Sequence, residues 1–376
     1  MQITAVEGFH LSCPLKRPFG WSQGWIDERT VGIVKITTDD GLVGWGEGSA
    51  DVAHLAPLLL GEDPMDRTGL WERCFHSLYN ANNFVGFGGS ALSAIDIALW
   101  DLAGKAAGRP LYDLLGGRVR NRVAVYATGL YYTEGEFPDR LLEEAREYVD
   151  AGYTGMKTKI GGLPIEQDVR RVAAIRETIG FDVQLMVDAN LAYNATTAIR
   201  IGRQLAELDV FWFEEPVNPR DIDGLLQVKA ALPMAIAGGE NLRTRFDFRD
   251  HLTRRAFDIV QPDVAHCGGL TEMQRIAAMA SACGTLVCPH VWGSPIMTAA
   301  SLHLAATLPP CPPARNPLPY VQEPVMEFDC TPNPIRDELC TTVFQAQDSY
   351  VDLPTGPGLG VEVDEQALLH FCQRAE

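Results

Sequence analysis

The chain has 376 residues, more than the roughly 250 of one (β/α)₈ barrel and too few for two, so a large domain with a small companion is expected. The formal net charge is −18 and no block of Lys or Arg occurs, which argues against nucleic acid and anionic membranes as partners. Nine cysteines without a CxxC pair, and no leader-like or membrane-spanning apolar run, favour a cytoplasmic protein with reduced thiols over a disulfide framework or a zinc site.

Residues 1–120 have the pattern of a small α+β domain. The segment RTVGIVKITTDDGLVGWGEG alternates apolar and polar residues on both sides of an Asp-Asp-Gly turn, which predicts an antiparallel hairpin. In SALSAIDIALWDLAGKAA, from Ser90 to Ala107, apolar residues recur at helical spacing and predict a helix.

Residues 121–350 change to short β-rich runs, each followed by a helical pattern, which is typical of βα units around a parallel sheet. The predicted strands are VAVYATG from Val123, GMKTKI from Gly155, VQLMVDAN from Val183, VFWFEEP from Val210, MAIAGGE from Met234, FDIVQPD from Phe257, LVCPHV from Leu286 and VMEFD from Val325. Eight such units predict an α/β fold with a closed (β/α)₈ barrel, a modified TIM barrel, rather than an open sheet.

Two segments depart from this repeat. The proline-rich stretch LPPCPPARNPLPYVQEP before the eighth strand cannot be helical throughout, so we expect a long loop. The tail, residues 351–376, follows a Gly-Pro-Gly break and is expected to return to the first domain, completing an α+β capping domain.

Polar residues stand at the C-terminal ends of the predicted strands, where barrels of this type carry their chemistry. In strand order they are Lys157 and Lys159, Asp188 and Asn190, Glu214 and Glu215, Glu240, Asp263, His290, and Glu327. From Asp188 to His290 the strand-end acids and the histidine follow one another at 23 to 27 residues, one βα unit per step.

Asp188, Glu214 and Glu240 place three carboxylates on successive strand ends. Without a cation these groups would repel one another and raise each other's pKa. Hard oxygen ligands suit Mg²⁺, which prefers octahedral oxygen coordination, so the sequence predicts a Mg²⁺ site. The alternative for each acid is a helix cap or a surface ion pair.

Lys157 and Lys159 are two residues apart on one strand, so their side chains share the face at the barrel mouth. Two ammonium groups beside a divalent cation would lower each other's pKa, leaving one lysine able to act as a base; the alternative is a solvated pair.

Asp263 would orient His290 and raise its basicity, giving a second base across the metal. Glu327, if protonated, could donate a hydrogen bond to the substrate; otherwise it is a surface acid. The remaining histidines, His266 among them, are read as structural.

The motifs TKI, VDAN, FEEP, GGEN, QPD with CGG, PHVWG and MEFD, together with the helix AIDIALWDLAGKAAGRPLYDLLGG, resemble the mandelate racemase-like subgroup of the enolase superfamily over nearly the whole chain. The resemblance implies the following roles: Asp188, Glu214 and Glu240 as Mg²⁺ ligands, Lys159 and the His290–Asp263 pair as opposing bases, Lys157 and Glu327 as groups that stabilise the substrate's carboxylate and enediolate, and Asn190 and Trp292 beside the substrate. It also implies a specificity loop, PFGWSQGWIDERT, between two strands of the capping domain. Its Trp21 and Trp25 form an aromatic lid or simply pack between the domains.

The muconate-lactonising branch has a lysine where this chain has Asp263, so the racemase-like branch fits better. The motifs PHVWG, MEFD and GPGLG are most similar to members that act on sugar acids and sugar lactones. The resemblance implies removal of the proton next to a carboxylate, followed by lactone opening, with a sugar-acid dehydratase or a racemase as alternatives, and a homo-oligomer. A different class, a non-catalytic metabolite-binding barrel, would not be expected to keep every ligand and both bases. A glycosidase would leave Lys157, Lys159 and His290 without roles.

Overall fold

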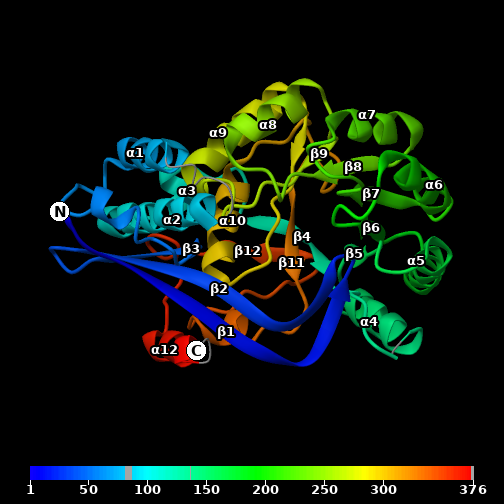
Figure 1. The fold of residues 1–376 in the computed structure, drawn as a ribbon, viewed down its shortest axis with the longest axis horizontal. Helices are drawn as coiled ribbons and strands as arrows, with labels where there is room; N and C mark the ends of the chain where they lie inside the picture. Colours follow the sequence, from blue (N-terminus) through cyan, green and yellow to red (C-terminus); the bar gives the residue numbers. More distant parts are fainter. Residues whose placement is uncertain (81–86, 136, 374–376) are drawn as a thin grey trace.

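The computed structural model describes residues 1–80, 87–135 and 137–373, and its N-terminal part is an antiparallel sheet covered by helices (Figure 1). Its elements are β1 (Ile3–Trp21), β2 (Gly24–Thr38), β3 (Val43–Gly48), η1 (Ala56–Leu58), α1 (Arg67–Asn80), α2 (Phe87–Ala107) and α3 (Leu111–Leu114). The sheet order is β1-β2-β3, and β2 pairs with β3 across the turn at Asp39–Gly41. The predicted hairpin and the predicted helix are both present.

The segment predicted as a loop, residues 18–30, is instead the end of a β-hairpin. β1 continues to Trp21 and β2 begins at Gly24, with Gly20 opposite Trp25. Only Ser22 and Gln23 form the turn. The loop that the resemblance implied was therefore wrong, because both strands of the hairpin continue through the proline, glycine and aromatic residues of this segment. In Figure 1 the hairpin, in dark blue, runs from the small domain to the barrel beside β5 and α4.

Helix α2 lies so close to β3 that the strand has glycine where the two backbones meet. A Cβ atom at Gly46 would lie 1.8 Å from the carbonyl oxygen of Ala94 and one at Gly44 would lie 2.2 Å from that of Ala98. Neither oxygen can move without breaking the helix. The sheet and the helix can therefore pack at this distance only with glycine at these positions.

We expect Gly46→Ala to lower the free energy of unfolding by about 2 to 3 kcal/mol, because the added methyl group overlaps a helix backbone. Denaturant unfolding followed by circular dichroism measures the change. Gly69→Ala is the matched control. Gly69 lies in α1 with open space where its Cβ would be, so alanine should stabilise the protein by about 0.5 to 1 kcal/mol. Equal effects of the two substitutions would contradict the packing argument.

The second part of the chain is a barrel of eight parallel strands, as predicted. The strands are β4 (Arg122–Thr128), β5 (Gly155–Lys159), β6 (Gln184–Asp188), β7 (Val210–Glu214), β8 (Ala235–Gly238), β9 (Ile259–Val260), β10 (Leu286–Val287) and β11 (Val325–Asp329). The helices between them are α4 (Asp139–Asp150), α5 (Ile165–Ile179), α6 (Ala195–Ala206), α7 (Ile222–Ala231), α8 (Thr244–Thr253), α9 (Gly269–Ala282) and α10 (Pro295–Thr307). The sheet runs from β10 through β4 to β11, and the Glu327 N–H donates to the Pro289 carbonyl (3.3 Å) where its two ends meet. None of the described helices is long and apolar enough to cross a membrane.

The two-residue period of the strands separates an outer apolar face from an inner one. On β4, Val123, Val125 and Ala127 belong to the large core under the helices, whereas Ala124 and Tyr126 belong to the cluster inside the barrel. The other members of the inner cluster are Met186, Trp212, Ala237, Ile259, Leu286, Cys288 and Val325. The side chains of this inner cluster fill the interior of the barrel below its mouth. Continuing the same alternation by two residues brings Asp188, Glu214 and Glu327 to the mouth.

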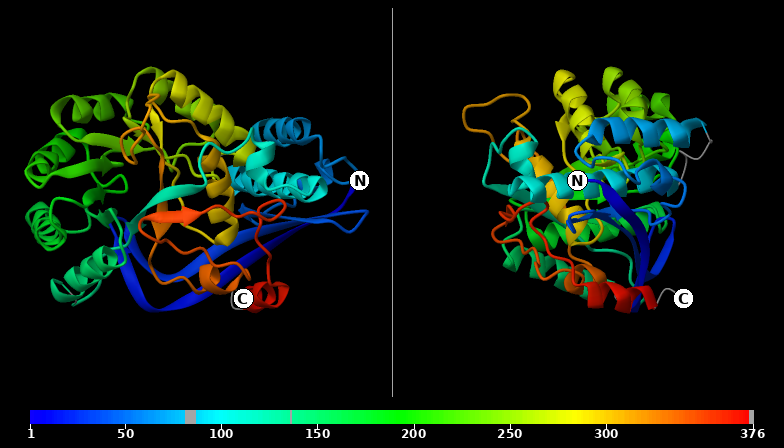
Figure 2. Two further views of the ribbon diagram at one scale, coloured as in Figure 1. Left: turned by 180° about the vertical axis from the view of Figure 1, so that it is seen from behind. Right: turned by 90° about the vertical axis from the view of Figure 1, so that its left-hand side faces the viewer.

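The C-terminal part contacts both domains. The segment 308–324 contains no helix, as predicted. After β11 come the short α11 (Pro334–Glu338), β12 (Tyr350–Asp352), which pairs antiparallel with β4, and α12 (Glu365–Gln373). Both views of Figure 2 place α12, in red, beside β1 in dark blue, and Glu365 accepts a hydrogen bond from Lys35 of β2 (2.7 Å). The domain limits at residues 120 and 350 stay a prediction, and residues 374–376 of the predicted tail lie outside the described residues.

Carboxylates of the small domain cap two helices of the barrel. Asp96 of α2 accepts from the Thr271 N–H in the first turn of α9 (2.8 Å). Glu47 of β3 accepts from the Ser294 hydroxyl (2.6 Å) and from the Met297 N–H (3.0 Å) at the start of α10. An anion satisfies the free N–H groups of a helix N-terminus and interacts favourably with its dipole. These contacts fix the small domain over the barrel mouth.

Asp96 should make stability depend on pH. Burial raises its pKa to about 7 and outweighs the hydrogen bond from Thr271, so the folded state holds this proton to higher pH than the unfolded chain does. The stability that it contributes is present below pH ~4 and is lost as pH rises through about 7. Relative to wild type, Asp96→Asn should therefore gain on the order of 3 kcal/mol between pH 4.5 and pH 8. Denaturant unfolding at several pH values measures this, and parallel curves for the two proteins would contradict it.

Candidate active site

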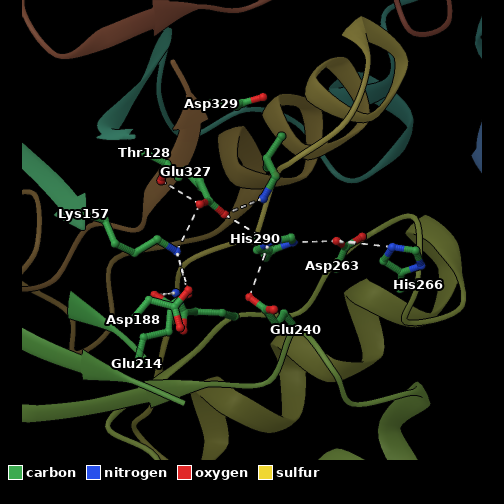
Figure 3. Close-up of polar contacts among 12 residues, drawn as sticks. Thr128, Lys157, Asp188, Glu214, Glu240, Asp263, His266, His290, Glu327 and Asp329 are labelled. Carbon is green, nitrogen blue, oxygen red and sulfur yellow. Dashed lines mark hydrogen bonds and ion pairs between the residues drawn. The ribbon is translucent and has the colours of Figure 1, made fainter. Parts of the chain in front are cut away.

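Three carboxylates from adjacent strand ends meet at the barrel mouth. Asp188 ends β6, Glu214 ends β7, and Glu240 follows β8, and one oxygen from each lies within 4.8 Å of the others. Asp188 and Glu214 are fully buried. Figure 3 shows Asp188 and Glu214 beside Lys157, and Glu240 beside His290. Three hard oxygen donors in one cluster fit a divalent cation such as Mg²⁺.

The two lysines of β5 point into this cluster. The Lys157 ammonium lies 2.6 Å from Glu214 and 3.0 Å from Glu327, and the Lys159 ammonium lies 2.5 Å from Asp188. Burial alone would lower the pKa of both amines, but the adjacent carboxylates outweigh it and raise the pKa of each well above its usual value. The lysines were expected to lower each other's pKa. Lys157 does lower the pKa of Lys159, but Asp188 has the larger, opposite effect. Of the carboxylates that raise these pKa values, Asp188 and Glu214 are also candidate ligands of a metal ion.

His290 lies on the opposite side of the triad from the lysines. Its Nδ1 is 2.6 Å from Asp263, so the two residues meet as the adjacent strand ends predict. Its Nε2 lies 3.4 Å from both Glu240 and Glu327 and faces into the mouth (Figure 3). Burial would lower the pKa of His290, but these carboxylates outweigh it and raise the pKa to about 10. The imidazole thus has one nitrogen held by Asp263 and the other at the site.

Glu327 points into the mouth but accepts hydrogen bonds at both oxygens. Thr128 donates to Oε1 (2.6 Å), and the Val291 N–H donates to Oε2 (3.2 Å). Burial would raise the pKa of Glu327, but Lys157 and His290 reverse that effect and lower it to about 2. The sequence allowed a protonated Glu327 that donates to substrate. In this structure it is instead a carboxylate that forms an ion pair with Lys157 (3.0 Å).

The sequence analysis missed several residues that support these groups. Gln261 and Trp212 both donate to Glu214 Oε2, at 2.7 and 3.1 Å, and Thr128 orients Glu327. Trp212 and Gln261 each lie two residues before a strand-end acid, and Thr128 is the last residue of β4. Because alternate residues of a strand point into the barrel, this spacing could have identified all three. Asn241 donates to both oxygens of Glu215, which keeps that acid outside the triad.

The residues predicted beside the substrate divide into two groups. Asn190 is buried above Asp188, with its Oδ1 unpartnered among the described residues, and its carbonyl accepts from Gln23 (2.9 Å) at the hairpin turn. Trp292 lies under the guanidinium of Arg29 (3.6 Å), and its buried Nε1 has no partner in the described part of the chain. Both border the mouth.

The two tryptophans of the hairpin are placed differently. Trp25 is 52% exposed and lines an outer groove of about 460 Å³ with Phe137 and Leu163. Trp21 is half-buried at the end of β1. The polar turn residue Ser22, rather than either tryptophan, contacts the mouth, by donating to the Ala189 carbonyl (2.8 Å). Within the described ranges, no hydrogen bond, ion pair or ring contact joins Trp21 or Trp25 to the carboxylate triad, so their place at the substrate stays a prediction.

Comparison with known proteins identifies the family. Residues 4–116 match the model "Mandelate racemase / muconate lactonizing enzyme, N-terminal domain" and residues 140–367 match "Enolase C-terminal domain-like". The chain is 40% identical to D-galactarolactone cycloisomerase of Agrobacterium fabrum over 99% of both chains, and 36% identical to arabinonate dehydratase of Saccharolobus solfataricus over 88% of this chain and 87% of that protein. The crystal structure of a racemase from Streptomyces coelicolor A3(2) with bound magnesium has a TM-score of 0.86 and 31% identity, covering 98% of this chain and 99% of that one. The chain belongs to the mandelate racemase / muconate lactonizing enzyme family and is an enzyme of the enolase superfamily.

Proposed function

We propose that this enzyme removes the proton α to a carboxylate of a sugar-acid lactone, and that the resulting enediolate opens the lactone by β-elimination. The observation that carries the proposal is the placement of two candidate bases around one carboxylate triad. Lys159 approaches from β5 and His290 follows β10, five strands further along the sheet order. A substrate carbon between them would present its proton to a base on either face.

Asp188, Glu214 and Glu240 would hold Mg²⁺, in keeping with the bound magnesium of the related racemase structure. When bound, Mg²⁺ would polarise the substrate's carboxylate and so make its α-proton more acidic. Lys157 lies at the same carboxylates and adds positive charge where negative charge develops on the substrate. Trp212 and Gln261 keep Glu214 oriented through two hydrogen bonds, so the site is built before substrate arrives.

Either Lys159 or His290 takes the α-proton, depending on the configuration of the substrate. Asp263 holds the Nδ1 side of His290, which leaves Nε2 to exchange the proton with substrate. Glu327 holds both Lys157 and His290 in place through its two oxygens. The hairpin turn at Ser22 and Gln23 covers the end of β6 and excludes water from that side.

Lactone opening is preferred over dehydration because the relative with 40% identity over the full chain is named a cycloisomerase. Dehydration is the second candidate, favoured by the similarity to arabinonate dehydratase. The two reactions share the first step and differ in the leaving group, which is a lactone oxygen in one and a hydroxyl group in the other. Cytoplasmic location and a homo-oligomeric state remain predictions from the sequence.

Solvent deuterium incorporation, followed by mass spectrometry across sugar acids and their lactones with Mg²⁺ present, tests the proposal. We expect a lactone to give an α-keto acid of unchanged mass apart from deuterium. Turnover of the free acid with loss of water would establish the dehydratase instead, and exchange without keto acid would establish a racemase. No exchange with any compound, while Mg²⁺ binds, would overturn the proposal and favour a non-catalytic barrel.

A further inference from the structure

Between the sheet of the small domain and the barrel mouth lies a cavity of about 640 Å³. It borders the catalytic cluster at three points. Trp292 follows His290 by two residues, His266 lies 4.0 Å from the Asp263 carboxylate, and Arg243 donates to the Glu240 carbonyl (3.4 Å). Figure 3 shows Asp263 between His290 and His266, so this wall of the cavity lies directly behind the proposed base.

Each acid that lines this cavity already has a partner. Glu47 accepts hydrogen bonds from three donor groups at the start of α10, Glu28 accepts from Ser12 (2.7 Å), and Asp51 pairs with His10 (3.3 Å). These carboxylates therefore already bind donors or a histidine of the protein itself. A ligand would meet little unpaired negative charge from these three groups.

Arg243 is the opposite case. It lines the cavity half-buried, and its guanidinium makes no ion pair with any residue that the structure describes. The guanidinium donates a hydrogen bond to the backbone carbonyl of Glu240. His266, whose Nδ1 contacts Ser90 (2.7 Å), lines the same cavity. The unpaired charge facing the cavity is thus positive, in a protein whose net charge is −18. An unpaired guanidinium is well suited to bind a carboxylate.

We propose that Arg243, with His266 beside it, is the subsite for the second carboxyl function of a sugar diacid, so that the substrate is a diacid monolactone rather than a monocarboxylic acid. This rests on the proposed function. One carboxylate of the substrate would occupy the metal site, and the lactone ester of the other would extend to Arg243.

The same subsite favours lactone opening over dehydration. In the elimination, the C–H bond at the α-carbon breaks and its proton goes to the base. The C–O bond at the β-carbon then breaks, and its electron pair goes to the ester oxygen. The ester becomes a free carboxylate, the enol gains a proton to become the keto acid, and no water is gained or lost. A departing carboxylate is stabilised by a cation, which Arg243 would supply, whereas a departing hydroxyl group needs a proton from an acid.

The test compares the Mg²⁺-loaded wild type with Arg243→Gln and Arg243→Lys on D-galactarolactone and on D-galactonate, a matched monocarboxylic acid. For the lactone, Arg243→Gln should raise KM or lower kcat/KM at least tenfold, and Arg243→Lys should recover part of the loss. Deuterium exchange with D-galactonate should be unchanged in both variants. Arg220→Gln, at an exposed arginine in the loop between β7 and α7, is the control and should behave as wild type.

Equal losses on the lactone and on D-galactonate, or no loss on the lactone, would overturn the subsite and leave the proposed function standing. If Arg243→Gln does not fold, competition in the wild type decides. Galactarate, with two carboxylates, should inhibit lactone turnover at least tenfold more strongly than D-galactonate does, and equal inhibition would overturn the proposal. Wild type that exchanges protons with none of these compounds or any other sugar acid would overturn the proposed function itself.

Discussion

Lys159→Met and His290→Asn should each lower α-proton exchange by about 10²- to 10⁴-fold, and each should do so for a different configuration at the α-carbon. Lys159 contacts the triad at Asp188 and His290 contacts it at Glu240, so under the proposed function each base would serve one face of the substrate. Methionine keeps the length of the lysine side chain in its buried site, and asparagine keeps a polar group beside Asp263. Deuterium exchange with pairs of epimeric sugar acids, followed by NMR, measures the two losses separately.

The control for this pair is Lys229→Met, because that lysine lies on α7 and binds Asp258 and the Arg255 carbonyl away from the mouth. It should exchange protons at the wild-type rate. Mg²⁺ affinity, measured by calorimetry, should be retained in all three variants. If Lys159→Met and His290→Asn lose exchange with the same epimer and keep it with the other, the two-sided arrangement of bases is wrong.

Loss of a residue that only supports a metal ligand typically lowers metal affinity about 10- to 100-fold. Glu214→Gln removes a proposed ligand itself and should lower Mg²⁺ affinity by more than this, whereas Glu215→Gln should leave Mg²⁺ affinity near that of the wild type. The two glutamates are consecutive, but only Glu214 faces the triad, whereas both oxygens of Glu215 accept from Asn241. Calorimetric titration with Mg²⁺ of the metal-free variants measures the difference. Chelation of divalent cations should abolish exchange in the wild type, and added Mg²⁺ should restore it.

A loss of Mg²⁺ affinity in Glu215→Gln equal to that in Glu214→Gln would contradict the assignment of the ligands. Unfolding midpoints of both variants serve as the control for structure. Since Gln261 and Trp212 can still donate to the remaining carbonyl oxygen of a glutamine at position 214, we expect both variants to fold.

The sequence could predict the barrel and its strand-end residues because both depend on local pattern. A strand places alternate residues inside, and one βα unit separates each strand end from the next, so Asp188, Glu214 and Glu240 could be assigned to one mouth without any contact being known. The contact of His290 with Asp263 followed from the same order of strands. The helix from Ser90 was found from its apolar spacing, although the structure begins it at Phe87.

What the sequence could not predict depends on contacts between distant segments. Glu47 and Ser294 are 247 residues apart, and Arg29 and Asp329 are 300 apart, so no periodicity within either segment indicates that they meet. The hydrogen-bonding state of Glu327 depends on Thr128, which comes from a strand at the other end of the barrel sequence. The lysine pKa values likewise follow from which carboxylate each ammonium contacts rather than from the spacing of the two lysines.

The capping of α9 and α10 by Asp96 and Glu47 bears on how such a protein can diversify. A barrel inherited without its own small domain would have two helix ends whose N–H groups lack an acceptor, close to the strand that carries His290. Recombination that exchanged whole domains between relatives would therefore disturb the mouth of the barrel even if the catalytic residues were intact. New specificities are more accessible through single substitutions around a retained pair of domains, at positions such as the hairpin turn and Arg243.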